Sequence, residues 1–155
     1  MEIVLAEARH IDAITELERD IFSLPWSKKS FMSELEDKNS IFLAAEDGGV
    51  TVGFAIMKTY KNEGEIYNIA VSGDHRRRGV GDALMARLLS EAAKRGVDTV
   101  FLDVRESNSP ARALYKKYGF YDLNIRRGYY DAPKEDAVIM IRMRAEENEN
   151  ADFSD

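Results

Sequence analysis

A short basic loop is the stretch of this chain whose residue types are best suited to bind an anion. It reads Arg76-Arg77-Arg78-Gly79-Val80-Gly81, and an amphipathic helix is predicted to begin at its end. Free N–H groups at a helix start point outward, and the helix dipole adds about half a positive charge there. Glycine lacks a Cβ, so a phosphate can approach the backbone, and arginine can hold its oxygens in pairs. The loop is therefore predicted to bind a phosphate group.

The spacing within this loop distinguishes it from two other phosphate-binding loops. It is not a Walker loop, because no Gly-Lys-Ser/Thr closes it, and it lacks the third glycine of the dinucleotide fingerprint. Its pattern is Arg-x-x-Gly-x-Gly, from Arg76 through Gly79 to Gly81. A basic turn that only caps a surface helix is the alternative interpretation of the loop taken alone.

The elements on either side of the loop determine where it lies. A strand over residues 65–71 leads into it, and a helix over residues 79–94 follows. The strand over residues 99–104 comes after this helical crossover, so it should run parallel to residues 65–71. Other strands are predicted at residues 1–6, 41–45, 50–60, from 120 onward and at 137–143, the last two separated by residues 129–133. Other helices are predicted at residues 11–22, with Glu18 among its periodic positions, from Ser27 through Leu35, and from an N-cap at Ser109.

Composition limits the class of protein. The chain has 155 residues, 45% of them hydrophobic and 32% charged, as in a soluble globular domain. It has no apolar run near 18 residues and no charged-then-apolar leader, so we expect a cytoplasmic protein without a membrane span. Without cysteine, any acyl transfer must avoid a cysteinyl intermediate. His10 and His75 lie far apart, so no histidine metal site is expected, and each is predicted to be a solvated turn residue.

Charge is distributed unevenly along the chain. The net charge of -6 argues against a general nucleic-acid-binding protein and leaves room for a basic partner. Residues 146–155 are acidic and almost without apolar side chains, so a disordered tail is predicted there. Residues 1–145 remain as a single domain.

Several further motifs follow one another in an order that resembles a known family. They are Asn68-Ile69-Ala70-Val71, the basic loop, residues 102–108, 114–120, 126–130 and 135–137, with Pro25-Trp26-Ser27 upstream. The set resembles the Gcn5-related N-acetyltransferases, and within them the RimI-type ribosomal-protein-alanine N-acetyltransferases, from residue 1 to about 143. The resemblance implies an α/β (α+β) fold, in which helices flank a mixed, mostly antiparallel central sheet.

The resemblance also implies acetyl-coenzyme A as the acetyl donor, and no metal. The strand backbone would pair with the pantetheine arm, the loop would hold the pyrophosphate, and Asn108 would hydrogen-bond the pantetheine. An acidic Asp82 faces a phosphate unfavourably unless its side chain points into solvent. The implied donor-binding residues are Ile69, Ala70, Val71, Arg76, Arg77, Arg78, Gly79, Val80, Gly81, Asp82 and Asn108.

For the chemistry, the resemblance assigns a general base to Asp103 and the acid that protonates the departing thiolate to Tyr115. The family more often has glutamate at the first position, and aspartate is one methylene shorter, so a water would bridge it to the amine. Asp103 as a strand-end carboxylate paired with Arg105 or Arg127, and Tyr115 as a core tyrosine, remain alternatives. Glu106 is a weaker alternative base.

The implied substrate is a protein N-terminus, with alanine or a similar small first residue, of a small-subunit ribosomal protein. An α-amine has a reference pKa of ~8, against ~10.4 for lysine, so it needs a weaker base. Trp26, Tyr129 and Tyr130 are predicted to line the peptide groove, although the first can be core and the pair a strand-end aromatic cluster. A lysine or small-amine acetyltransferase and a non-catalytic acetyl-coenzyme A-binding module remain as other functions.

Overall fold

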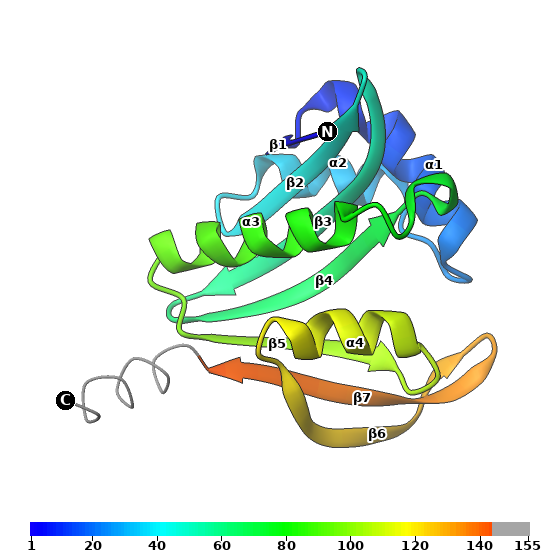
Figure 1. Ribbon diagram of the computed structural model, residues 1–155, viewed down its shortest axis with the longest axis vertical. Helices are drawn as coiled ribbons and strands as arrows, with labels where there is room; N and C mark the ends of the chain where they lie inside the picture. Colours follow the sequence, from blue (N-terminus) through cyan, green and yellow to red (C-terminus); the bar gives the residue numbers. More distant parts are fainter. Residues whose placement is uncertain (144–155) are drawn as a thin grey trace.

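The fold is built on a seven-stranded sheet with helices on both of its faces (Figure 1). The computed structural model describes residues 1–143, so the predicted tail at residues 146–155 lies outside the described residues. The strands are β1 (Glu2–Leu5), β2 (Ser40–Asp47), β3 (Val50–Tyr60), β4 (Glu63–Val71), β5 (Thr99–Arg105), β6 (Tyr121–Asp131) and β7 (Lys134–Met143). The α-helices are α1 (Ile11–Ile21), α2 (Lys28–Glu36), α3 (Val80–Lys94) and α4 (Ser109–Lys117), with short 3-10 turns η1 (Ala8–His10) and η2 (Gly73–His75).

The strand order is β1-β2-β3-β4-β5-β7-β6. Strands β4 and β5 run parallel because α3 connects them, and the other neighbouring strands of the described sheet are antiparallel. This confirms the predicted mixed, mostly antiparallel sheet. Among residues 1–143, no helix is both long and apolar enough to cross a membrane.

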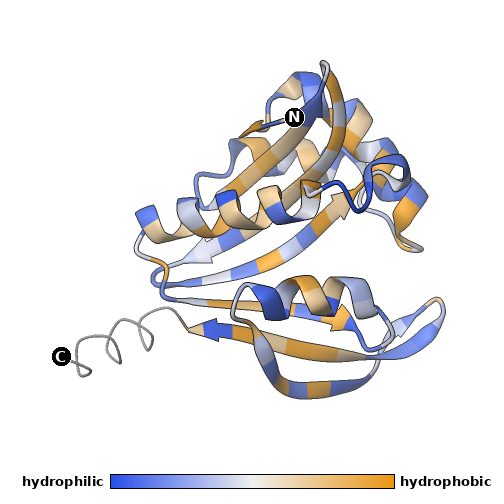
Figure 2. Ribbon diagram, in the orientation of Figure 1, coloured by the Kyte–Doolittle hydropathy of each residue, from blue (hydrophilic) through white to orange (hydrophobic). Residues whose placement is uncertain are grey.

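Two hydrophobic clusters hold the helices to the sheet. On one face, Leu84 and Leu88 of α3 and Tyr115 of α4 pack with strand residues. On the other face, Ile14 of α1 and Phe31 of α2 pack in a second cluster, in which the Phe31 ring lies edge-on to that of Phe54 of β3 at 5.5 Å. Burying each of these side chains contributes about 1.5–3 kcal/mol. Figure 2 shows these apolar stretches and the strongly hydrophilic loop that precedes α3.

The start of α4 differs from the predicted cap. The N-cap is Asn108, not Ser109, and its side-chain oxygen accepts a hydrogen bond from the N–H of Ala111 at 3.2 Å. Pro110 has no backbone N–H, so the first N–H after it that needs a partner is that of Ala111. Asn108, one residue before the predicted cap, accepts that N–H. At the start of α2, by contrast, Ser27 is the cap that the sequence predicts.

Two other local predictions were wrong. Tyr129 and Tyr130 lie inside β6, not between the last two strands, because a bulge near Gly128 absorbs the irregular backbone and pairing then resumes. His10 is 1% exposed: its Nδ1 accepts the N–H of Glu7, and its Nε2 lies 3.0 Å from Glu46.

Candidate active site

The site begins where β4 and β5 separate. Their pairing ends at Ile66 and Leu102, although β4 continues for five more residues, and Figure 1 shows the two strands diverging beyond that point. Tyr67 is a bulge residue, since Ile66 and Asn68 pair with consecutive residues of β3. The predicted donor-binding residues Ile69, Ala70 and Val71 follow it. They pair with β3 on one side only among the described strands, so one backbone edge is left for a ligand.

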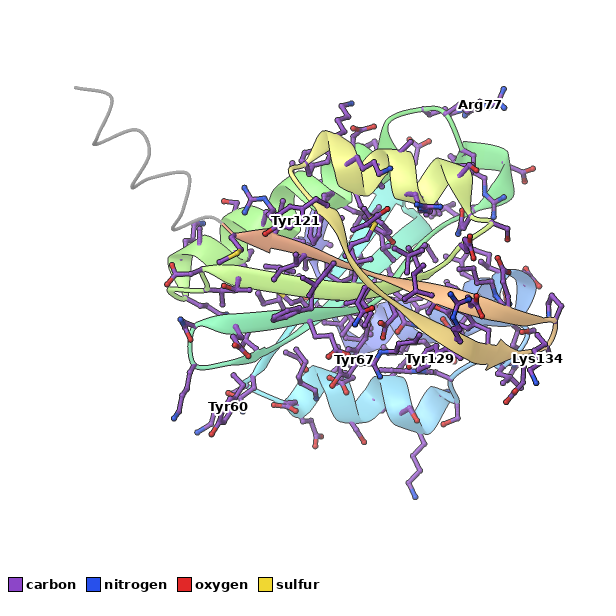
Figure 3. The ribbon with its side chains drawn as sticks, turned by 90° about the horizontal axis from the view of Figure 1, so that it is seen from below. Tyr60, Tyr67, Arg77, Tyr121, Tyr129 and Lys134 are labelled. Carbon is purple, nitrogen blue, oxygen red and sulfur yellow. The ribbon has the colours of Figure 1, made fainter. Side chains whose placement is uncertain are left out.

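The basic loop connects this free edge to α3. Arg77 and Gly79 have positive φ angles of 65° and 80°, and Gly79 is the N-cap of α3. Val80 anchors the loop in the core at 2% exposure, whereas the three arginines are exposed. Figure 3 shows Arg77 projecting from the α3 and α4 side of the sheet. The first N–H groups of α3 and three exposed arginines thus lie within one short segment, which keeps the loop a candidate phosphate-binding site.

Asp82 does not face the loop as an unpaired charge. Its carboxylate accepts hydrogen bonds from Nζ of Lys117 at 2.6 Å and from the hydroxyl of Tyr118 at 3.1 Å. The Lys117 contact holds the pKa of Asp82 below its usual range. The sequence requires this side chain to point into solvent, and it is indeed partly exposed. It is also neutralised by a lysine, which ties the start of α3 to the end of α4.

The α4 region contributes two candidate site residues, its N-cap Asn108 and Tyr115 within the helix. The side-chain oxygen of Asn108 caps the helix, and its amide nitrogen makes no hydrogen bond to residues 1–143. Tyr115 is 6% exposed and its ring lies 5.9 Å from that of Phe120, so it is a core residue as well as a candidate acid. Burial raises the pKa of Tyr115, which keeps the phenol protonated as an acid must be.

Asp103 is the first residue of β5 beyond the pairing with β4. Its Oδ1 lies 3.6 Å from Nε of Arg126, so the predicted arginine pairing exists but with a different arginine. Arg105 pairs with Glu135 instead, and Arg127 pairs with Asp136.

Aromatic side chains also lie near the opening between β4 and β5. The Tyr129 and Tyr130 rings lie edge-on at 5.1 Å, and the guanidinium of Arg105 stacks on Tyr130 at 4.3 Å. Burial, together with the charge of Asp103, raises the pKa of Tyr130 to about 12. Figure 3 shows Tyr67 and Tyr129 on the side of the sheet that α2 covers.

Trp26 combines the two roles that the sequence left open. Its ring packs at 5.4 Å from the buried Phe31 and at 6.0 Å, edge-on, from the exposed Tyr67. It is therefore part of the core on one side and part of the surface beside the β4 bulge on the other.

Two carboxylates at this site were missed. Glu18 is 2% exposed and accepts hydrogen bonds from the backbone N–H of Trp26 and from the side-chain amide of Asn68, both at 2.8 Å. The sequence could have identified Glu18, because it lies on the helix face that carries the periodic apolar residues and is therefore expected to be buried. Glu65 lines the opening beside Asp103. No local sequence pattern identifies Glu65 as a site residue, because the residues that lie beside it in space depend on how the strands pair.

Comparison with known proteins agrees with this geometry. Residues 11–120 match the model of the acetyltransferase (GNAT) family. The chain is 39% identical over 136 residues to the [ribosomal protein bS18]-alanine N-acetyltransferase of Escherichia coli, a match covering 86% of this chain and 91% of the relative. The crystal structure of the ribosomal-protein-S18-alanine N-acetyltransferase from Escherichia coli has a TM-score of 0.84 and 37% identity, covering 92% of each chain. That of Ard1 from Thermoplasma volcanium has a TM-score of 0.85 and 27% identity, covering 92% and 96%.

The divided sheet, the basic loop and the matches identify the class of protein. The chain belongs to the acetyltransferase (GNAT) family, whose members use acetyl-coenzyme A. Within that family it is an N-acetyltransferase of the ribosomal-protein-alanine type.

Proposed function

We propose that this enzyme acetylates the α-amine of an N-terminal alanine, or a similar small residue, on a small-subunit ribosomal protein. The observation that carries the proposal is the position of Asp103, at the mouth of the opening beside the free edge of β4. The names of the relatives indicate ribosomal protein bS18 as the target. Ribosomal proteins are made in the cytoplasm, so the enzyme would act there.

The proposed donor site runs along the free edge of β4 into the basic loop. Backbone groups of residues 69–71 would pair with the pantetheine arm, and residues 76–82 would hold the pyrophosphate through N–H groups and arginines. The free amide nitrogen of Asn108 would donate a hydrogen bond to the pantetheine. Acetyl-coenzyme A supplies the activated acetyl group, and the chain supplies position and proton transfer.

The proposed chemistry divides between two residues. Asp103 would take a proton from the amine, through a water if its short side chain does not reach, and Tyr115 would give a proton to the departing sulfur. The protonated state of Tyr115 that burial favours supports the second role.

The proposed peptide site lies on the other face of the sheet. Trp26, Tyr129 and Tyr130 would contact the first residues of the substrate, and the exposed Tyr129 supports a surface open to a peptide. A small first side chain would fit there, and a blocked amine would not react, because its lone pair is delocalised into the amide and cannot attack the thioester.

A peptide with a free N-terminal alanine and one internal lysine tests the proposal. Mass spectrometry after incubation with acetyl-coenzyme A should locate the acetyl group on the α-amine, and the same peptide blocked at its N-terminus should react little. Label found mainly on the lysine would overturn the N-terminal assignment and favour the lysine alternative.

A further inference from the structure

The turn of the β6–β7 hairpin is fastened to β5 by one arginine. Figure 1 shows this hairpin extending beyond the end of β5. Arg105, the last residue of β5, donates hydrogen bonds from Nη1 to the carbonyl of Pro133 at 2.8 Å and from Nη2 to that of Ala132 at 3.3 Å. Both carbonyls lie between β6 and β7. A guanidinium presents its N–H groups in one rigid plane, so two bonds to adjacent carbonyls fix the orientation of that plane.

The same guanidinium covers a ring of the proposed peptide site. Its central carbon lies 4.3 Å from the centre of the Tyr130 ring, within the range of a cation–π attraction. The ring is half-buried, and the ring of Tyr129 lies edge-on to it at 5.1 Å. Because it is contacted on one face by Arg105 and edge-on by Tyr129, the Tyr130 ring has little freedom to turn.

Glu135 holds Arg105 from another direction. One of its carboxylate oxygens lies 3.4 Å from Nη1 of Arg105, and the other accepts the backbone N–H of Ser107 at 2.6 Å. Hydrogen bonding by Ser107, with a smaller contribution from Arg105, lowers the pKa of Glu135, so this carboxylate is charged at neutral pH. The guanidinium is therefore fixed by the turn carbonyls and by a carboxylate before any substrate binds.

The other arginines near the hairpin have different partners. Arg126 lies over the ring of Tyr129, at 5.5 Å. The Arg127 side chain is 83% exposed, and its ion pair stays within the hairpin. Among residues 1–143, Arg105 is thus the arginine that stacks on Tyr130.

We propose that Arg105 is a positioning residue for the acceptor peptide, which acts by holding the ring of Tyr130 in place. The inference rests on the proposed peptide site and adds a residue that supports it. A ring that is already ordered loses little side-chain freedom when the peptide binds, so the peptide binds more tightly. Arg105 stays protonated throughout the working pH range, and its ion-pair partner is Glu135, so it takes no part in proton transfer.

Steady-state kinetics of wild type, Arg105→Gln and Arg127→Gln with an alanine-initiated peptide test this role. Arg105→Gln should raise the KM for the peptide about tenfold, with kcat and the KM for acetyl-coenzyme A changed less than about twofold, because it removes binding common to ground and transition states. Arg127→Gln removes an ion pair of the same hairpin without a contact to Tyr130, so it should follow wild type.

Arg105→Lys is a milder change at the same position. It keeps the charge but not the planar fork, so the KM for the peptide should rise only about threefold. The melting temperature of each variant shows whether it folds, and Arg105→Lys carries the test if Arg105→Gln does not.

A double variant shows whether Arg105 acts through Tyr130. Tyr130→Leu removes the ring that Arg105 is proposed to hold. In the Tyr130→Leu background, Arg105→Gln should therefore raise the KM for the peptide little further. Increases that multiply in the double variant would show that Arg105 acts independently of Tyr130 and would overturn the proposal.

The kinetic constants separate this proposal from the proposed function. Equal KM values for the peptide in Arg105→Gln and Arg127→Gln would overturn the role of Arg105, and so would a fall in kcat alone or an equal rise in both KM values. None of these results changes the acceptor assignment, which depends on where the acetyl group is found. If wild type acetylates only lysine, the N-terminal proposal fails, and the same comparison of KM values is made with the lysine peptide.

Discussion

Glu18 of α1 accepts a hydrogen bond from Asn68 of β4 at 2.8 Å, although 50 residues separate the two. The other oxygen of the same carboxylate accepts the backbone N–H of Trp26. One buried side chain therefore fastens the loop before α2 to the bulged part of β4, and holds the proposed peptide-binding surface beside the proposed donor site.

Glu18→Gln should change how stability depends on pH. Burial raises the pKa of Glu18 above its ordinary 4.5, so the folded state binds its proton more tightly than the unfolded state does. The stability that Glu18 contributes is complete below that ordinary value and is lost as pH rises through the raised one. Urea denaturation from pH 4 to 8 should show wild type losing stability relative to Glu18→Gln over this window. The exposed Glu16→Gln should run parallel to wild type; parallel curves for Glu18→Gln would contradict the prediction.

Gly79→Ala should weaken acetyl-coenzyme A binding. Gly79 has φ +80°, where a Cβ adds about 1–2 kcal/mol of strain, so the loop should shift its N–H groups away from the phosphate position. Gly73→Ala, in the same loop but without a positive φ and with open space around its Cβ, is the matched control. Calorimetry should separate the two variants, and equal affinities would remove the loop from the donor site.

Tyr115→Phe should lower turnover on the order of 10²-fold with little change in the affinity for the donor. The phenyl ring keeps its packing against Phe120, so the melting temperature should hardly move. Tyr121→Phe removes an exposed hydroxyl and should leave turnover unchanged. Activity within a few-fold of wild type in Tyr115→Phe would make this tyrosine a core residue only.

Lys117→Ala should weaken donor binding by exposing the charge of Asp82 at the start of α3. The Asp82→Asn change removes that charge, so the double variant should recover most of the lost affinity. The effect should shrink at high salt, because the pair is exposed and screened. Additive losses in the double variant would show that Lys117 acts on the donor directly and not through Asp82.

The sequence by itself determined the local parts of this enzyme. The basic loop, the helix after it and the neighbouring strands follow from glycine positions, caps and hydrophobic periods, all of which act within a few residues. Asn108 as a cap was misjudged by one residue, since Pro110 changes which N–H needs a partner. Periodicity alone does not single out Asp103 or Tyr115. Their roles were predicted from the resemblance of the surrounding motifs to the family.

Only the tertiary structure decided which charges meet. Asp103 lies beside Arg126, and not beside the predicted Arg105 or Arg127, because the register of β5, β7 and β6 brings that one guanidinium across. Glu65 lies beside Asp103, and Glu18 is buried against Trp26 and Asn68, for the same kind of reason. A period of two or 3.6 residues indicates the face on which a side chain lies. Its partner across the sheet depends on strand pairing between residues far apart in the chain, and electrostatic interactions follow those distances.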